Sequence, residues 1–132
     1  MMNKILMLLI GGCVLCWGCG EKGPEPGEVA AQTAKVYYEY LLQGKYDQFV
    51  DGRYQPDSIP DTYREQLITN ARMFAGQMND EHQGLKAVHV ANGEADTARH
   101  VANAFLVFTY GDKTTEEVVV PMVEREGVWY MR

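Results

Sequence analysis

The sequence has no cysteine beyond position 19, and its 3 cysteines lie three residues apart near the start, at Cys13, Cys16 and Cys19. Iron–sulfur clusters and cysteine-based zinc sites draw on four ligands that a folded chain presents. Because no later cysteine can supply the fourth ligand, this spacing does not complete such a site. We therefore predict neither a metal site nor a bound cofactor.

Several signatures of catalysis and of nucleic-acid binding are also missing. There is no glycine-rich phosphate loop, no serine-centred nucleophile elbow and no stripe of basic and aromatic residues. The 12 Lys and Arg are outnumbered by 18 Asp and Glu, whereas nucleic-acid binding needs clustered positive charge. The sequence thus argues against phosphate-loop and serine-nucleophile enzymes and against a nucleic-acid partner.

No apolar run is long enough for a good transmembrane helix, which needs about 20 residues. The first run, residues 5–10, follows Lys4 and is broken by two glycines, as in a secretory signal. The segment resembles a bacterial lipobox, in which a small residue precedes the lipid-bearing cysteine, and Gly18-Cys19 fits that pattern. Cys13 is the alternative anchor, although it leaves an apolar core of only about six residues. A soluble secreted protein cut near Gly20 is the other alternative.

These features predict three segments. Residues 1–18 are a lipoprotein signal peptide, residues 19–27 a lipid-anchored flexible tether rich in glycine and proline, and residues 28–132 a single domain. We expect the protein to attach through this lipid anchor to a membrane of the bacterial cell envelope, the outer membrane.

The first part of the domain is predicted to be helical. Apolar side chains spaced by three and four residues indicate a helix over residues 28–43, which Gly44 ends. A short second helix is expected over residues 45–52. The predicted inward face of the first helix comprises Val29, Val36, Tyr37, Tyr40 and Leu41.

A third helix is expected after two prolines, with Ser58 as its N-cap and Asp61 three residues later. Its apolar stripe should end near Asn79 or Asp80. That stripe comprises Tyr63, Leu67, Ala71, Phe74 and Met78.

The second part of the domain is predicted to be an antiparallel sheet. Asn92-Gly93 is typical of a two-residue hairpin turn, and Gly111-Asp112 indicates a second turn. The predicted strands cover residues 85–91, 97–110, 114–124 and 127–131. A two-residue second loop would place Leu106 beside Val119, whereas a three-residue loop would place it beside Val118 and Val120.

Both faces of the long strand carry apolar groups, whereas a sheet with one wet face should alternate between apolar and polar. Three helices can shield only one face of the sheet. We therefore predict that Val101, Phe105 and Val107 form an interface with a partner.

The order of three helices and four strands, with the segment YYEYLLQGKYDQF, the Tyr110-Gly111-Asp112 turn and the closing Gly127-x-Trp129, resembles the nuclear transport factor 2-like, or cystatin-like, superfamily. More narrowly, the chain resembles small bacterial lipoproteins of this class. The resemblance implies an α+β fold in which three N-terminal helices pack on a curved four-stranded antiparallel sheet. It also implies a pocket inside this cone and homodimers formed through the outer sheet face.

Aromatic residues are the candidates for a ligand site, because a tyrosine joins an apolar ring to a polar tip. The loop over residues 51–61 would be the lid of such a pocket. The predicted lining residues, suited to a small apolar ligand, are Tyr40, Tyr46, Tyr54, Phe74, Phe108 and Trp129.

We assign no catalytic residue. The predicted function is a non-enzymatic domain that binds a small ligand or a protein partner. The alternative is a small isomerase- or hydrolase-like enzyme, which requires His89, His100 or a buried carboxylate inside the cone. His82 lies in a polar stretch and is expected to be solvated. A purely structural module is a third hypothesis.

Overall fold

A computed structural model describes residues 24–55 and 57–132. The predicted signal peptide, Cys19 and most of the predicted tether lie outside these residues. Three helices precede one four-stranded antiparallel sheet whose strand order is β1-β2-β3-β4. The elements are α2 (Pro26–Leu42), α3 (Tyr46–Asp51), α4 (Asp61–His82), β1 (Leu85–Asp96), β2 (Val101–Tyr110), β3 (Thr115–Arg125) and β4 (Val128–Met131). The expected α+β class, with three helices and a four-stranded antiparallel sheet, is therefore confirmed for these residues.

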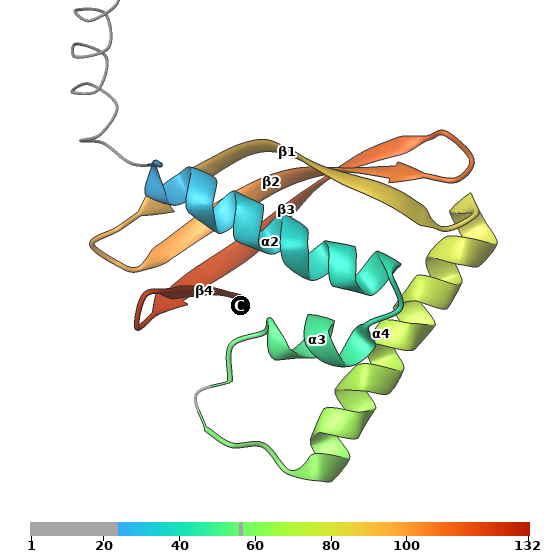
Figure 1. Ribbon diagram of the computed structural model, residues 1–132, viewed down its shortest axis with the longest axis horizontal. Coiled ribbons are helices and arrows are strands. Elements are labelled where there is room, and N and C mark those ends of the chain that lie inside the picture. The colour runs from blue at the N-terminus through green and yellow to red at the C-terminus, as the bar shows by residue number, and fades with distance from the viewer. Residues whose placement is uncertain (1–23, 56) are drawn as a thin grey trace, which may run out of the picture.

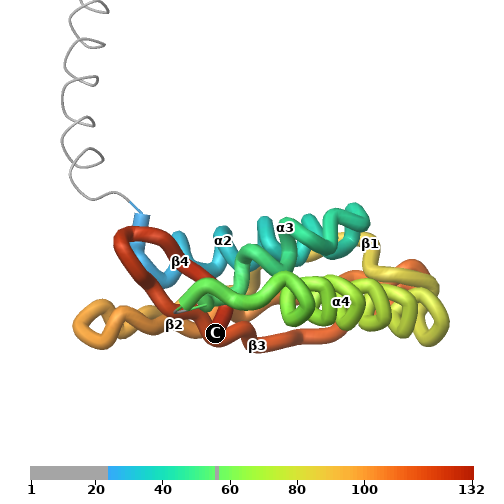
Figure 2. Tube along the Cα trace, turned by 90° about the horizontal axis from the view of Figure 1, so that it is seen from below, coloured from blue at the N-terminus to red at the C-terminus, as the bar shows by residue number. Residues whose placement is uncertain are grey.

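The three helices do not share one layer. Helix α2 lies across the sheet, α3 continues the same layer, and α4 runs beside them (Figure 1). Figure 2 shows that α4 is level with the sheet, whereas α2 and α3 form a second layer and the β4 end of the sheet curls toward them. Helix α4 packs mainly on α3 and touches the sheet at β1. Helix α2 contacts all four strands, α4 reaches the sheet at β1, and α3 packs mainly on the other two helices, so the expectation that all three helices pack on the sheet face is confirmed for α2 alone.

The first half of helix α2 contacts the sheet through small residues, and the predicted inward residue Leu41 is buried further along the helix. Ala30, Ala31 and Ala34 are fully buried, whereas the predicted inward residues Val29 and Val36 are exposed. Alanines let this part of the helix axis approach the strands closely. The helix begins at Pro26, two residues before its predicted start, and Gly27 is already buried within it.

The closest approach involves Gly93, which was predicted to be in a turn. Strand β1 continues through Asn92 and Gly93, with a register shift between Val90 and Asn92. A Cβ atom on Gly93 would overlap the carbonyl oxygen of Gly27. The absence of a side chain at Gly93 therefore allows α2 to contact β1 closely. The chain turns instead at residues 97–100, where His100 has a φ of 59°.

The second hairpin has the three-residue loop of the two alternatives. The Tyr110 amide donates to the Thr114 carbonyl at 2.9 Å, and Lys113 has a φ of 74°, as expected for this loop class. Leu106 therefore pairs with Val118. The face of β2 that packs on the helices forms the centre of the core and comprises Ala102, Ala104, Leu106, Phe108 and Tyr110.

Helix α4 begins at Asp61 and ends at His82, which is later than predicted. Pro60 precedes its first turn and no side chain caps it, so Ser58 does not have the predicted role. Gln83, with a φ of 63°, ends the helix in the left-handed conformation.

The end of α4 is clamped to the second hairpin by polar contacts. The His82 ring stacks on Tyr110 with centroids 4.5 Å apart, and its Nδ1 lies 3.2 Å from an Asp112 oxygen. The Tyr110 hydroxyl donates to Glu116 at 2.5 Å. Burial, followed by this hydrogen bond, raises the pKa of Tyr110. His82 is therefore packed and paired, which corrects the prediction of a solvated side chain.

Asp112 should make the stability of the fold depend on acid pH. Hydrogen bonds from Thr114, and then from His82, lower the pKa of Asp112 below its ordinary 3.8. A lowered folded-state pKa adds stability above the unfolded value, and this stability is lost as the pH falls through the folded value. We expect urea unfolding at about pH 6 and about pH 3 to show a smaller acid loss in Asp112→Asn than in the wild type. Equal acid losses in the two proteins would contradict this assignment.

Candidate functional site

The described chain has an apolar groove between α4 and the edge of β3, with a volume of about 340 Å³. Leu67, Ala71 and Phe74 line it from α4, and Val119 to Pro121 line it from β3. Phe74 and Val119 remain 41% and 54% exposed. The other lining residues are Tyr38, Phe49, Val50, Arg53, Asn70, Met131 and Arg132.

The groove exists because β4 is much shorter than β3. Strand β4 pairs with β3 only from Met122 to Arg125, and one further bond joins the Arg132 amide to the Pro121 carbonyl at 3.0 Å. The remainder of β3, residues 115–120, has no further strand partner among the described residues and is therefore an open sheet edge. Helix α4 lies level with this edge (Figure 2) but packs on α3 instead of on β3.

Aromatic rings join the groove to the core. The centroid of the Tyr38 ring lies 5.2 Å from that of Phe49 and 5.1 Å from that of Phe108. Tyr38 and Phe49 therefore form the wall of the groove on the side of the helices. Phe108 lies one layer deeper and is only 3% exposed.

The side chains that line the groove carry two positive charges, those of Arg53 and Arg132, and no negative charge within the described chain. Burial raises the pKa of the Tyr38 hydroxyl, and the nearby charge of Arg53 opposes that rise. The electrostatic field in the groove therefore favours an anionic group.

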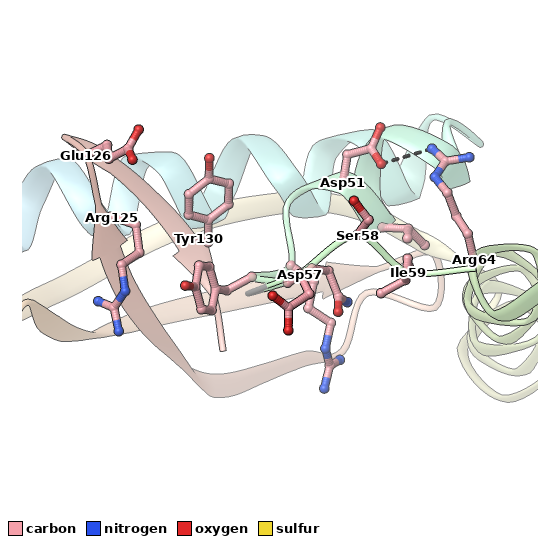
Figure 3. A pocket seen from close by; sticks show the side chains of 12 residues that line it. Asp51, Asp57, Ser58, Ile59, Arg64, Arg125, Glu126 and Tyr130 are labelled. Carbon is pink, nitrogen blue, oxygen red and sulfur yellow. Dashed lines mark hydrogen bonds and ion pairs between the residues drawn. The ribbon is translucent and has the colours of Figure 1, made fainter. Parts of the chain in front are cut away.

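A second, more polar pocket of about 530 Å³ adjoins the groove and shares Val50 and Arg53 with it. The loop after α3 supplies most of one wall, and Arg125, Glu126 and Tyr130 supply another (Figure 3). Arg64 donates to Asp51 at 2.9 Å, and Arg125 lies over the Tyr54 ring at 5.1 Å. Since these groups already have partners and the acids balance the arginines, the pocket selects for ligand charge less strongly than the groove does.

The structure does not gather the six predicted ligand residues into one site. Phe74 lines the groove and Tyr54 lines the polar pocket. Tyr46 lines a separate cavity near the start of β1, beneath Arg72 at 5.5 Å. Phe108 and Trp129 are core residues, and Tyr40 is half-buried outside the described lining of both main cavities. Of the predicted lid, residues 51–61, the described residues 53–55 and 57–59 lie in the wall of the polar pocket, together with Asp51.

The predicted interface residues Val101, Phe105 and Val107 are half-buried. They alternate with the core residues of β2 and so lie on the outer face, away from α2. That a second copy covers them stays a prediction. His89 is exposed and pairs with Val107 in the sheet register. His100 is in the exposed hairpin turn, where its Nδ1 lies 2.9 Å from a Glu124 oxygen.

The sequence reasoning missed Tyr38, Arg53 and Arg132 as groove residues. One signal in the sequence could have located the groove. The third predicted strand, residues 114–124, is twice as long as the fourth, residues 127–131, so part of its edge had to remain unpaired. The run Val118-Val119-Val120 marks that part.

None of the helices within residues 24–55 and 57–132 is both long and apolar enough to cross a membrane. Over the same part of the chain, no three His, Cys, Asp or Glu side chains are grouped so that they could hold a metal ion.

The chain matches no protein-family model. A search of curated proteins also gives no match. Among solved structures, it is similar to a candidate transpeptidase of the NTF2-like class from Campylobacter jejuni, with a TM-score of 0.59 and 11% identity over 74% of this chain and 92% of that chain. It also aligns with Aln2 from a Streptomyces species, with a TM-score of 0.45 and 17% identity over 83% of this chain and 88% of that chain. The first similarity, together with the helix and strand order, shows that this chain has the nuclear transport factor 2-like (NTF2-like) fold.

Proposed function

We propose that the protein is a binding module whose ligand occupies the groove between α4 and β3. The observation that carries this proposal is the composition of the groove, in which apolar walls from both sides meet two arginines. Ligand sites are typically apolar concavities with a few placed polar groups, and about 340 Å³ is at the small end of their range. The ligand should therefore offer a compact apolar surface and a negative charge.

Two exposed side chains of the groove explain why such a ligand would bind. Phe74 and Val119 keep much of their surface in water. Removing apolar surface from water contributes about 25 cal/mol of favourable free energy per Å². An anion near Arg53 would add charge complementarity that discriminates against cationic ligands.

The proposal can be tested with 8-anilinonaphthalene-1-sulfonate, an apolar anion whose fluorescence rises on binding. We expect Phe74→Glu to weaken dye binding about tenfold or more, because the variant loses an aromatic wall and adds a repelling charge. Val36→Glu is the matched control. Val36 is 42% exposed, almost the same as Phe74 at 41%, and it lies on α2 outside the groove lining. Similar affinities of the two variants for the dye would contradict the proposal.

We further propose that this module is anchored by a lipid on Cys19 to a membrane of the bacterial cell envelope. The sequence supports this through its signal-like segment and the small residue before Cys19. Two or more acyl chains give stable attachment. Cys19→Ala should therefore release the protein from the membrane fraction. Retention with palmitate labelling would move the anchor to Cys13.

A further inference from the structure

We infer that the groove takes an extended peptide segment that adds to the open edge of β3 as one more strand. The inference rests on the proposed function, since it names the ligand class of the same groove. Strand addition uses backbone hydrogen bonds for affinity and pockets for alternate side chains for selectivity. The edge of β3 offers the backbone groups, and the groove beside Val119 offers apolar side-chain contacts.

Along β3, the residues that do not bond to β2 direct their backbone N–H and C=O groups outward, as strand addition requires. The Tyr110 amide bonds to the Thr114 carbonyl, and the pairing then continues one to one, so even-numbered β3 residues bond to β2. In an antiparallel pair, the intervening residues direct N–H and C=O away from that partner. The Pro121 carbonyl, which accepts from Arg132, has this orientation. Val119 and Glu117 share it, and no backbone bond to another described element engages them.

The side chains beside this edge suit a strand. Val118, Val119 and Val120 form a β-branched run with high strand propensity. Natural edges of this kind are commonly guarded by charge, proline or a covering element. Here Glu117 and Pro121 flank the run, and Val119 is 54% exposed. On the opposite wall, Leu67 and Phe74 would contact alternate side chains of the added strand.

The position of α4 favours a single segment over a second copy of this chain. A neighbouring strand lies about 4.8 Å from its partner. Helix α4 lies level with the sheet (Figure 2) and lines the groove opposite β3, so a second copy would meet α4 where it needs to place its own sheet. The peptide should carry apolar residues at alternate positions and an acidic residue near Arg53 and Arg132, the positive end of the groove.

The test uses a phage-displayed library of random eight-residue peptides, panned on the purified protein. We expect enriched peptides with alternating apolar residues and an acid. By fluorescence anisotropy, their affinity for Val119→Pro should be about tenfold or more below that for Val119→Thr. Both variants change the same side chain, but only proline removes the outward N–H, and this N–H is not part of the β2–β3 ladder. No enrichment, or equal affinities, would overturn the inference.

A second measurement leaves the protein unchanged and remains decisive if Val119→Pro does not fold. Two forms of an enriched peptide would be made, one methylated at the odd-numbered backbone amides and the other at the even-numbered ones. One form should lose binding and the other should keep it, because a strand bonds to its neighbour through alternate residues. Equal binding of both methylated forms would overturn strand addition. If the peptide binds only to a dimer of this protein, the edge of β3 would be assigned to a second copy of the chain. That result would also overturn the addition of a peptide strand. If Phe74→Glu still lowers dye binding in these cases, the proposed function stands and only the strand mode fails.

Discussion

Gly93→Ala is expected to lower the free energy of unfolding by about 2–3 kcal/mol, at the upper end of the usual cost of overpacking. The added Cβ would overlap the carbonyl oxygen of Gly27 and press on the Ala31 side chain. Neither neighbour is a flexible side-chain end, so α2 must move away from β1. For a domain of this size the melting temperature should fall by about 10 °C.

Gly76→Ala is the matched control, because Gly76 lies inside α4 and a Cβ there would meet no atom within 4 Å. Alanine at such a helix position should raise stability by roughly 0.5–1 kcal/mol. Thermal unfolding followed by circular dichroism measures both variants. If Gly93→Ala were as stable as the wild type, the close contact of α2 with β1 would be wrong.

Trp129→Ala is expected to lower the free energy of unfolding by about 3–5 kcal/mol. Trp129 is only 6% exposed and belongs to the core. Its backbone carbonyl also accepts a hydrogen bond from the Tyr37 hydroxyl at 2.6 Å, which holds α2 to β4. Removing the ring would therefore leave a cavity beside this link between helix and sheet.

Val128→Ala is the control for this variant. Val128 precedes Trp129 in β4 but is 44% exposed, so its truncation should change stability by less than about 0.5 kcal/mol. Urea unfolding measures both. Dye binding distinguishes a core role of Trp129 from a ligand-lining role. If Trp129 is a core residue, Trp129→Phe should bind the dye with unchanged affinity. A marked loss of dye affinity in that variant would support the ligand-lining role predicted from the sequence.

The fold could be predicted wherever the pattern was local. Gly44 ends α2 with a φ of 81°, as the sequence indicated. The Asn92-Gly93 pair shows where local reasoning failed. The same two residues suit a hairpin turn, but the packing of Gly27 on Gly93 favours continuing the strand. Likewise, Val29 and Val36 matched an apolar helix face, while the alanines between them lie against the sheet.

The candidate site was predicted only in part. Leu67, Ala71 and Phe74 were correctly placed on one stripe of α4, and they line the groove together. The stripe could not show what faces it. Trp129 and Phe108 were assigned to a pocket because large rings suit both cores and ligand sites, and only burial distinguishes these two environments.

Local patterns were sufficient to predict three helices followed by four strands, the end of α2 and the alternation within β2. These features depend on neighbours in the chain, through helix periodicity, turn residues and the two-residue repeat of a strand. Packing between distant segments set the close approach of α2 to β1 through alanine and glycine, and the position of α4 level with the sheet. It also decided that the edge of β3 remains open beside Phe74. Those features depend on which distant segments compete for the same space, and a local pattern does not encode that competition.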